Sequence, residues 1–490
     1  MKNFNLVSVG TDSYKHSHWR LLPENTEVVS SYCEPRAGAR FPRTMFFGLQ
    51  YFLKAYLAGR IVTREKIEEG AERMYKHFGS DRVFNRVGWE HILKAHDGRL
   101  PVKIRALPEG TVVPEATPLF TIENTGGIPT AWLTNYLETI LMEMWMPTTV
   151  ATSSLAVRNI IRRYLDATGD VAGLGFKLHD FGYRGVGCPE YAALAGAAHL
   201  ATGAMGTDTL AAVDLLRDYY SEDMAGFSIP ATEHSIMTSR GPEGEADVVR
   251  QILREYPTGL VAMVIDSYDT HRFIRQVIGD NPDIIQAIRA RQGTVVFRPD
   301  SGELPGIDLE VFNGFARVFG TETNKKDYTV LPPQVRLIQG DGIKWYRTPE
   351  QVSKLTTWPT DINGYSHTVE DVLEAFRRNR ISADNIAFGS GGGLLQDFTR
   401  DTQRFAIKCS AQRRNGAWID IFKAPATDKT KNSKRGRLEV RKINGNFSVR
   451  SVPAGADYPT DRENWLQPTF ENGELQRDQT LADIRQRANE

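Results

Sequence analysis

The run LVAMVIDSYDT at residues 260–270 is the first of four short apolar segments that each end in a cluster of Asp or Gly residues. The other three are TVVFRPDSG at 294–302, VRLIQGDG at 335–342 and IAFGSGGG at 386–393. Each run is rich in β-branched residues and has little alternation of polar and apolar positions, which is typical of strands buried on both faces. We therefore predict parallel strands whose carboxyl ends form one ligand site.

The segments between these runs have the spacing of helices. In HTVEDVLEAFRRNRI at 367–381, Val369 and Phe376 share one face, as the helical repeat requires. Thr368 and Asp371 provide a start signal for the same helix. This alternation of buried strand, polar loop and helix predicts an α/β fold with a sheet or a barrel at its centre.

Composition limits the class of protein. The chain has 490 residues, 41% of them hydrophobic, which is enough for two domains. Lys plus Arg and Asp plus Glu both number 60, so no net charge favours nucleic acid or an anionic membrane surface, and we expect a small-molecule ligand. Three cysteines without CxxC spacing argue against a disulfide framework or a structural zinc site. We expect a cytoplasmic protein without a signal peptide or a membrane span.

The sequence pattern changes twice along the chain. Residues 1–150 mix helical stretches with short β runs broken by Pro and Gly, and we predict the N-terminal part of a mixed α+β sandwich domain there. Residues 151–394 contain the alternating strands and helices and are predicted to form an α/β barrel-like catalytic domain. Residues 395–490 begin with two strand-like runs joined at Asn415 and Gly416. We expect this last segment to pack back on the first domain.

Three of the strand ends carry groups suited to a phosphorylated ligand. The glycines at 389–393 are able to bind phosphate through backbone N–H groups, but such clusters are about as often tight turns. Arg298 and Asp300 serve either a ligand or an ion pair that closes a loop. Asp266 and Asp269 are spaced to hold Mg²⁺ or, alternatively, to cap the next helix.

Two further motifs contain aromatic and imidazole groups. In HDFGYRG at 179–185, Phe181 is suited to stack on a planar ring and Arg184 to meet an anion, although Phe181 considered alone is better placed in a core. His234 in PATEHS lies in a predicted polar loop, as a nucleophile or base or simply as an exposed side chain. The basic run from Lys423 is either a solvated loop or a phosphate clamp, and the neutral charge of the chain favours the clamp.

An ordered set of motifs covers nearly the whole chain: TDSYKHSH, FFGLQYFL, HDFGYRGV, GTDT, PATEHS, DSYD, RPDSG, IQGDG and FGSGGGLLQ. By these motifs the chain resembles the nicotinamide phosphoribosyltransferases, which are type II phosphoribosyltransferases. This family joins nicotinamide to phosphoribosyl pyrophosphate in NAD salvage, giving nicotinamide mononucleotide and pyrophosphate. The resemblance implies an irregular (β/α) barrel plus a mixed α+β sandwich domain, and a homodimer whose active sites are shared between subunits.

The resemblance also implies roles for individual residues. Phe181 and Tyr14 of the partner subunit would sandwich the pyridine ring, and Asp208 would accept a hydrogen bond from the carboxamide. The residues implied to bind the base, the ribose and the 5′-phosphate are Arg184, Arg298, Asp300, Gly340, Asp341, Gly391 and Gly392. The residues implied to surround pyrophosphate or the phosphates of ATP are Asp12, Arg36, Arg400, Lys408, Lys423 and Lys431.

For catalysis, the resemblance implies that His234, Arg298 and Asp300 act directly, with Mg²⁺ as cofactor and ATP as the donor that phosphorylates His234. Asp266 and Asp269 are the candidate metal ligands. Two alternatives stay open: the same fold acting on nicotinic acid, and a non-catalytic binding protein. The carboxylate of Asp208 would repel that of nicotinic acid, and so favours nicotinamide.

Overall fold

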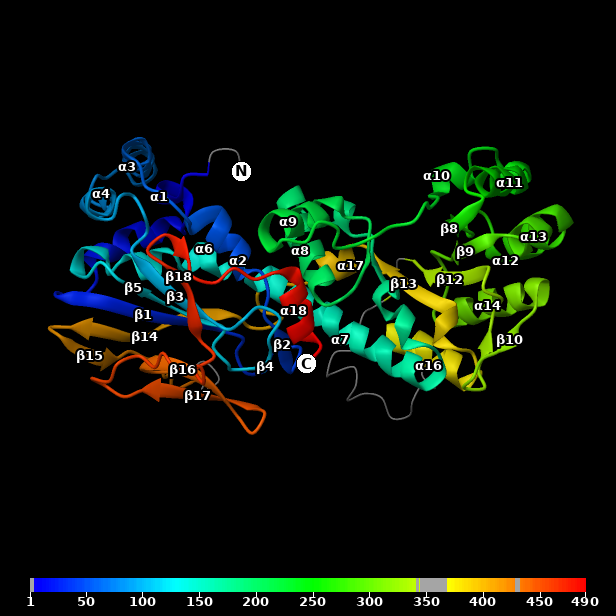
Figure 1. The fold of residues 1–490 in the computed structure, drawn as a ribbon. Coiled ribbons are helices and arrows are strands. Elements are labelled where there is room, and N and C mark those ends of the chain that lie inside the picture. Colours follow the sequence, from blue (N-terminus) through cyan, green and yellow to red (C-terminus); the bar gives the residue numbers. More distant parts are fainter. Residues whose placement is uncertain (1–3, 341–342, 344–367, 428–431) are drawn as a thin grey trace. The chain divides into compact units, whose positions relative to one another are not determined.

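The computed structural model describes residues 4–340, 343, 368–427 and 432–490 (Figure 1). The chain forms two compact units, and each has its own large sheet. Unit 1 contains Met1–Thr152, Leu216–Glu222 and Phe398–Glu490, and unit 2 contains Ser153–Leu215 and Asp223–Asp397.

Unit 2 is built around a sheet of six strands, and every pair of neighbouring strands is parallel. In sheet order these strands are β7 (Gly206–Thr207), β6 (Leu178–Asp180), β13 (Ile386–Ser390), β12 (Val335–Gln339), β9 (Gln292–Arg298) and β8 (Thr258–Val264). The four apolar runs that predicted buried parallel strands supply β13, β12, β9 and β8. These four strands are consecutive in the sheet, so that prediction is confirmed.

A connecting segment pairs with both edges of this curled sheet. Phe227 pairs in parallel with Gly206 of β7, and Ala231 pairs in parallel with Ala262 of β8. The backbone N–H of Thr207 donates to the carbonyl of Phe227 at 2.9 Å, in line with the first of these pairings. Because β7 and β8 are the two edges of the sheet, the segment joins them, and the predicted irregular barrel is confirmed.

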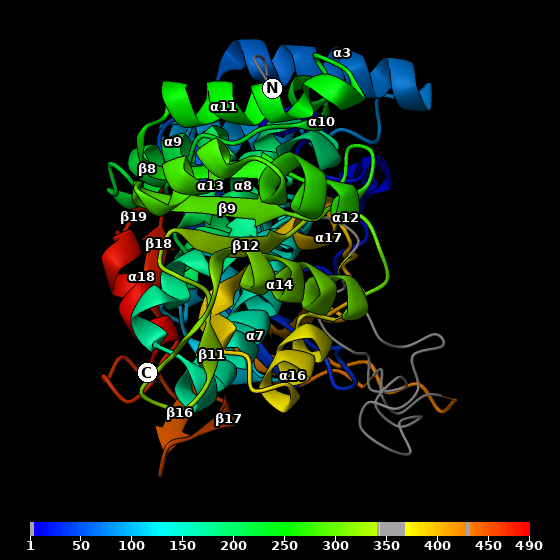
Figure 2. The ribbon, with the colours of Figure 1, turned by 90° about the vertical axis from the view of Figure 1, so that its right-hand side faces the viewer.

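Helices follow the strands and cover the outside of the barrel; Figure 2 shows α11, α13 and α14 around β8, β9 and β12. The predicted helix at 367–381 is α16, and Thr368 and Asp371 form the capping box at its start. The helices and short strands of unit 2 and its borders are α7 (Trp145–Thr168), η4 (Val171–Phe176), η5 (Tyr183–Gly185), α8 (Pro189–Ala201), α9 (Leu210–Tyr220), α10 (His234–Met237), η6 (Pro242–Gly244), α11 (Glu245–Glu255), α12 (Thr270–Arg272), η7 (Phe273–Gly279), α13 (Pro282–Arg289), α14 (Gly306–Phe319), β10 (Glu322–Thr323), β11 (Thr329–Val330), α16 (Val369–Arg378), η8 (Ala383–Asn385) and α17 (Gly392–Leu395).

Cationic side chains form hydrogen bonds to backbone carbonyls at the amino ends of the barrel strands. Lys177, Arg291 and Arg336 each donate to three backbone carbonyl groups. Burial lowers the pKa of Lys177 to about 8, since its ammonium group is removed from water. The cations therefore give hydrogen-bond partners to backbone carbonyls at this end of the barrel, which stabilises it and leaves the carboxyl ends for a ligand.

Asp308, in the first turn of α14, is an acid whose carboxyl group is buried without hydrogen bonds from the described residues. Within the described part of the chain neither of its carboxyl oxygens has a hydrogen-bond partner, and burial raises its pKa to about 8. The folded protein therefore holds this proton up to about pH 8, whereas the unfolded chain releases it near pH 4. Stability contributed by the neutral acid is present at low pH and is lost as the pH rises toward 8.

We expect Asp308→Asn to remove this dependence. The stability of the variant relative to the wild type should increase by roughly 4 kcal/mol between pH 5 and pH 9, because the amide cannot ionise. Urea denaturation at several pH values measures this difference, with Asp280→Asn, which alters an exposed carboxylate, as the control. A difference that stays constant with pH would show that Asp308 does not titrate in this way.

Unit 1 contains a seven-stranded antiparallel sheet. In sheet order its strands are β15 (Ala417–Asp420), β14 (Ala406–Arg414), β1 (Thr26–Glu34), β5 (Phe120–Asn124), β3 (Val102–Ala106), β18 (Gln467–Glu471) and β19 (Glu474–Leu475). Strands from the beginning and the end of the chain thus form one sheet. The turn between β14 and β15 is at Asn415 and Gly416, whose φ angles of 47° and 78° suit a two-residue hairpin, as predicted.

A hairpin, a two-stranded antiparallel pair and several helices complete unit 1, so the predicted mixed α+β character of this part is confirmed. Its other elements are α1 (Leu6–Val9), η1 (Ser13–Arg20), β2 (Arg43–Met45), α2 (Leu49–Phe52), η2 (Leu53–Leu57), α3 (Arg64–Phe78), α4 (Arg86–Ala95), β4 (Val112–Pro114), η3 (Ile128–Thr130), α5 (Leu133–Tyr136), α6 (Glu138–Met142), β16 (Arg437–Ile443), β17 (Asn446–Val452) and α18 (Leu481–Ala488). Among the helices that the structure describes, none has both the length and the apolar character needed to cross a membrane.

The short segment Leu216–Glu222 belongs to unit 1, which the predicted domain ranges do not include. Its Tyr220 hydroxyl donates to the buried carboxylate of Glu109 at 3.0 Å. Glu109 also accepts from the backbone N–H groups of Gly48 and Gln50. Burial raises the pKa of Glu109, and these donors oppose that rise. The end of α9 is therefore held by a polar contact that links distant parts of the sequence.

Candidate active site

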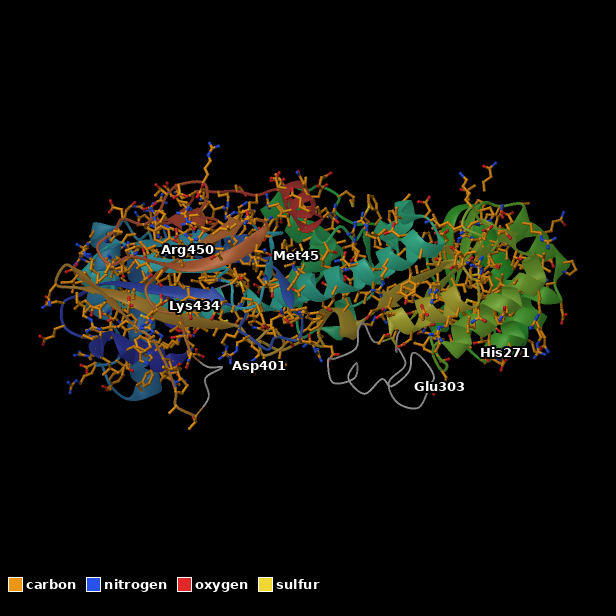
Figure 3. The ribbon with its side chains drawn as sticks, turned by 90° about the horizontal axis from the view of Figure 1, so that it is seen from below. Met45, His271, Glu303, Asp401, Lys434 and Arg450 are labelled. Carbon is orange, nitrogen blue, oxygen red and sulfur yellow. The ribbon has the colours of Figure 1, made fainter. Side chains whose placement is uncertain are left out.

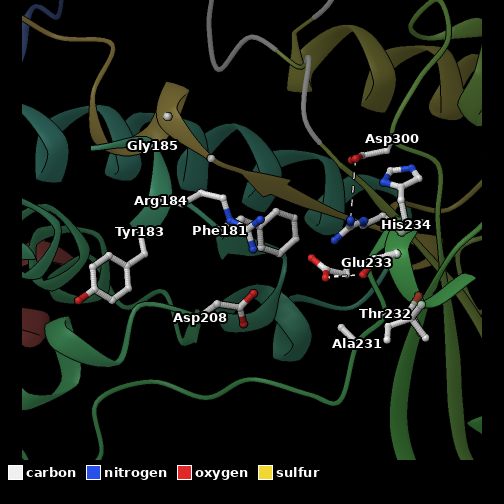
Figure 4. A pocket seen from close by; sticks show the side chains of 15 residues that line it. Phe181, Tyr183, Arg184, Gly185, Asp208, Ala231, Thr232, Glu233, His234 and Asp300 are labelled. Carbon is white, nitrogen blue, oxygen red and sulfur yellow. Dashed lines mark hydrogen bonds and ion pairs between the residues drawn. The ribbon is translucent and has the colours of Figure 1, made fainter. Parts of the chain in front are cut away.

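A cavity of about 1010 Å³ opens at the carboxyl ends of the barrel strands in unit 2 (Figure 4). It brings together eight of the predicted site residues: Phe181, Arg184, Asp208, His234, Arg298, Asp300, Gly391 and Gly392. The predicted meeting of several strand ends is therefore observed. The cavity also contains residues that the sequence interpretation did not single out, among them Tyr183, Ser235 and Ile236. The signal for Tyr183 and Ser235 was their position inside the HDFGYRG and PATEHS motifs, and Ile236 directly follows the second motif.

Phe181 lies at the centre of the cavity, directly after β6. Its N–H donates to the carbonyl of Ser390 in β13 at 2.9 Å, and its ring lies against the backbone of Gly389. A Cβ atom on Gly389 would lie 1.9 Å from Cε2 of this ring, so only glycine fits beneath it. The guanidinium carbon of Arg298 is 5.5 Å from the ring centroid. The core position favoured for Phe181 when considered alone is wrong, because the ring is only half-buried and faces the cavity.

We expect Gly389→Ala to displace the Phe181 ring and to lower kcat/KM for a planar substrate by roughly 100-fold, since misplacement of about 1 Å is that costly. Steady-state kinetics together with ring-current shifts of the bound substrate would measure the effect. Gly187→Ala is the matched control, because the space around Gly187 is open. Equal kinetics for the two variants would contradict this role of Gly389.

Asp208 follows β7 and presents a partly exposed carboxylate to the cavity. Its Oδ1 is 2.9 Å from Nε2 of His179 and accepts a hydrogen bond from the hydroxyl of Ser228. Burial acts to raise the pKa of Asp208, but the hydrogen bond and charge of His179, the bond from Ser228 and the charge of Arg298 outweigh it and lower the pKa. Asp208 is therefore ionised at neutral pH.

Asp180 is a fully buried carboxylate that shapes the floor of this region, and the sequence interpretation did not assign it a role. Its Oδ1 accepts from the N–H of Gly182 at 2.7 Å, and its Oδ2 accepts from the hydroxyl of Thr207 at 2.9 Å. Its carbonyl accepts from the N–H of Asp208 at 2.9 Å. Asp180 thus fixes the turns that carry Phe181 and Asp208.

Asp300 lies at the opposite end of the cavity from Tyr183 in Figure 4. Arg298 Nη2 is 3.8 Å from Asp300 Oδ2, and both side chains are largely buried. Gly340 packs against Asp300, because a Cβ there would lie 1.8 Å from Asp300 Oδ1. The absence of a side chain at Gly340 thus leaves room for the carboxylate. Asp341, which was predicted beside Gly340, lies outside the described residues.

The glycine-rich turn after β13 meets the HDFGYRG turn. A Cβ atom on Gly185 would lie 3.0 Å from the backbone N of Gly392, so the two backbones approach closely. Gly391 and Gly392 line the cavity where α17 begins, and the side chain of Arg184 extends toward Phe181 in Figure 4. Main-chain groups and one guanidinium therefore face this part of the cavity, a combination suited to an anion.

His234 begins the single turn of α10 at the rim of the cavity. Its Nε2 is 3.2 Å from Oδ1 of Asp266, and the Asp266 side chain is only 5% exposed. Oδ2 of Asp266 accepts from the hydroxyl of Ser301 at 2.5 Å. This arrangement orients the imidazole through a buried carboxylate.

The two candidate metal ligands have different surroundings. Asp269 caps α12 and accepts from the N–H of Arg272, which is the alternative that the sequence left open. Asp266 is engaged by His234 and Ser301. Within the described ranges, no group of three or more His, Cys, Asp or Glu side chains is arranged to hold a metal ion. A metal role for Asp266 and Asp269 stays a prediction.

The predicted phosphate-binding cations lie on unit 1. Burial lowers the pKa of Lys408, and the charges of Arg36, Lys423 and Arg400 lower it further, whereas Glu138 opposes this shift. Mutual repulsion of this kind requires proximity, so the four cations form one cluster, here called the basic cluster. Such a cluster is suited to a polyphosphate. Lys431 lies outside the described residues.

The other predicted residues of unit 1 are in its N-terminal part. Tyr14 is 58% exposed, and Asp12 accepts from the hydroxyl of Thr139 at 2.8 Å. Lys434, labelled in Figure 3, pairs with Glu34 at the end of β1. Burial raises the pKa of Glu34, while the charges of Lys434 and Arg36 oppose the rise. The ring of Tyr14, unlike the buried carboxylate of Glu34, is exposed and able to contact another surface.

Comparison with known proteins decides the family. A nicotinamide phosphoribosyltransferase of Xanthomonas campestris pv. campestris is 42% identical over 486 residues, which cover 98% of this chain and 97% of that protein. The chain belongs to the nicotinamide phosphoribosyltransferase family. A second family member, from Acinetobacter baylyi, is 32% identical over 97% of this chain and 95% of its own length. The resemblance stated from the motifs is confirmed, and so is the prediction of a pentosyltransferase enzyme.

Family models and solved structures agree with this placement. The model of the nicotinamide phosphoribosyltransferase N-terminal domain matches residues 5–104, and that of the nicotinate phosphoribosyltransferase (NAPRTase) family matches 176–358 and 365–473. The structure of nicotinate-nucleotide pyrophosphorylase from Pyrococcus furiosus has a TM-score of 0.59 at 17% identity, covering 100% of this chain and 96% of that one. Human nicotinic acid phosphoribosyltransferase has a TM-score of 0.54 at 16% identity, covering 98% and 93%. At these identities the likeness supports the fold alone.

Proposed function

We propose that this enzyme transfers the phosphoribosyl group of phosphoribosyl pyrophosphate to nicotinamide, giving nicotinamide mononucleotide and pyrophosphate. The observation that carries the proposal is the cavity of unit 2, where a flat aromatic ring, an ionised Asp208 and the Arg298–Asp300 pair face one space. Family membership supports the same reaction.

In this proposal nicotinamide stacks on Phe181, and its carboxamide N–H donates to the free oxygen of Asp208. Asp300 and the backbone at Gly340 bind the ribose hydroxyls, and Gly391 with Gly392 binds the 5′-phosphate through N–H groups, with Arg184 adding charge. The ring nitrogen is already a nucleophile. The site therefore needs mainly to hold it in line with C1 of the ribose.

Departure of pyrophosphate leaves positive charge on the ribose and places negative charge on the leaving group. The basic cluster of a partner subunit would stabilise that negative charge in a homodimer with shared active sites. Tyr14 of the partner subunit would then cover the free face of the base, which accounts for its exposure in a single chain. Gel filtration with light scattering tests for the dimer.

Mg²⁺ would supply further charge stabilisation on the pyrophosphate when bound. Asp266 is the residue best placed to meet it, directly or through water, since Asp269 is occupied as a helix cap. A donor set this small fits an ion held mainly by substrate phosphates, which is the usual manner for Mg²⁺.

We also infer that ATP phosphorylates His234 and thereby drives the reaction. The support is its position at the rim of the cavity, its contact with buried Asp266 and the resemblance to family members with a phosphorylated histidine. Added negative charge at His234 would rearrange the cationic groups around the pyrophosphate. The unpaired cysteines Cys33, Cys188 and Cys409 fit a reducing cytoplasm.

The second candidate function is transfer to nicotinic acid by the same fold. Asp208 favours nicotinamide, because its lowered pKa keeps it charged and it would repel the carboxylate of nicotinic acid. A purely binding role is disfavoured by the assembled Phe181, Arg298, Asp300 and His234.

Parallel product assays with nicotinamide, nicotinic acid and quinolinate, each with and without ATP, test the proposal. We expect nicotinamide mononucleotide as the main product and a faster reaction with ATP. A product from nicotinic acid alone would favour the second candidate. No product from any of the three bases would favour a binding protein.

A further inference from the structure

Ser301 lies between the ribose end of the cavity and His234, and the proposed reaction gives it no role. We infer that Ser301 is a positioning residue that transmits occupancy of the ribose end to His234 through Asp266. This inference rests on the proposed function in one respect, namely that a ribose binds at Asp300.

The first support is the way in which both oxygens of Asp266 are used. Ser301 Oγ donates to Oδ2 at 2.5 Å, and His234 Nε2 lies 3.2 Å from Oδ1. A hydroxyl bound to a carboxylate at this distance is a charge-assisted hydrogen bond. The Asp266 side chain is only 5% exposed, so the carboxylate itself is shielded from water, whereas the imidazole of His234 is 48% exposed.

The second support is the position of Ser301 in the chain. It directly follows Asp300, which packs on Gly340 and lines the cavity, so a ligand that moves Asp300 also moves Ser301. The strands that carry the two acidic residues are neighbours, and the N–H of Ile265 donates to the carbonyl of Arg298 at 3.2 Å. The loops after β8 and β9 are therefore tied in two places, once through the backbone and once through Ser301.

The consequence concerns the imidazole. A carboxylate only accepts, so its contact fixes the proton of a neutral His234 on Nε2 and leaves the lone pair on Nδ1. Ser301 holds the carboxylate in the rotation that makes this contact. Without the hydroxyl, Asp266 is free to turn, and His234 loses its fixed tautomer and orientation even though both residues remain.

The test follows the imidazole of His234 by NMR in the full-length protein labelled with ¹³C at histidine Cε1. His234→Ala assigns the signal, and ribose 5-phosphate is the probe. We expect ribose 5-phosphate to shift the Cε1 signal of His234 at a fixed pH in the wild type and in Ser301→Thr, which keeps the hydroxyl. The shift should be absent in Ser301→Ala and present in Ser239→Ala, an exposed serine just after α10.

Kinetics provide a second readout. In Ser301→Ala the stimulation of transfer by ATP should fall about 10-fold, as for loss of one hydrogen bond to a charge, while transfer without ATP changes less than about 3-fold. A ligand-dependent shift that persists in Ser301→Ala would overturn the inference. So would a Ser301→Thr variant that behaves like Ser301→Ala.

The two proposals fail in different ways. If the wild type makes no nicotinamide mononucleotide, the proposed function fails, whatever the NMR experiment shows. If the wild type makes this product but ribose 5-phosphate leaves the His234 signal unchanged, the link through Ser301 is overturned while the proposed function stands.

Discussion

Asp208→Asn is expected to remove most of the preference for nicotinamide over nicotinic acid. In the wild type an ionised carboxylate accepts from the carboxamide of nicotinamide and repels the carboxylate of nicotinic acid. The amide of asparagine has the same shape, carries no charge and is able to donate to a carboxylate. The ratio of kcat/KM values for the two bases should fall roughly 100-fold, which is less than for a fully buried polar contact because the Asp208 side chain is 46% exposed.

Kinetics with each base under identical conditions measure this ratio. The oxygen of asparagine is still able to accept from His179 and Ser228, so the local structure should persist. Asp218→Asn is the control, since Asp218 is an exposed carboxylate paired with Arg217. An unchanged ratio in Asp208→Asn would show that another group selects the base.

His234→Ala is expected to retain basal transfer and to lose stimulation by ATP. The residue stands at the rim of the cavity and is not needed to position the base, so chemistry without ATP should fall less than about 10-fold. The gain from ATP should disappear, because no group remains at this position to accept a phosphoryl group. Initial rates with and without ATP, and acid-labile ³²P incorporation, measure the two effects.

His271→Ala is the matched control for this experiment. His271 is exposed on α12 and lies 3.2 Å from Glu310, away from the residues that line the cavity. If ATP still accelerated His234→Ala as much as the wild type, phosphorylation of His234 would not be the route of coupling.

The main strands were predictable because each is a continuous apolar run that ends in Asp or Gly. β6 and β7 were not predicted as strands, since three and two residues are too few to show a period. The closing segment was also missed. It joins the sheet edges through only two isolated pairings, Phe227 with Gly206 and Ala231 with Ala262, and such pairings leave no pattern in the sequence.

In the candidate site, too, some features are visible in short sequence motifs, and others depend on contacts between residues far apart in the sequence. Motifs identified Phe181, Asp208 and Arg298. For each, the residue type and its immediate neighbours in sequence are enough to indicate the chemistry. The contact of Phe181 with Gly389 joins positions far apart in the sequence, so only the folded chain reveals it. Asp269 illustrates a different limit, because a carboxylate spaced to bind a metal and one spaced to cap a helix look alike in sequence.

The central claim is most directly tested by competition in one vessel. Equal concentrations of nicotinamide and nicotinic acid are incubated with the enzyme, phosphoribosyl pyrophosphate, ATP and Mg²⁺, and the products are identified by mass spectrometry. We expect nicotinamide mononucleotide and pyrophosphate in equal amounts, with little nicotinate mononucleotide. A predominance of nicotinate mononucleotide, or the absence of any pyridine nucleotide, would contradict it.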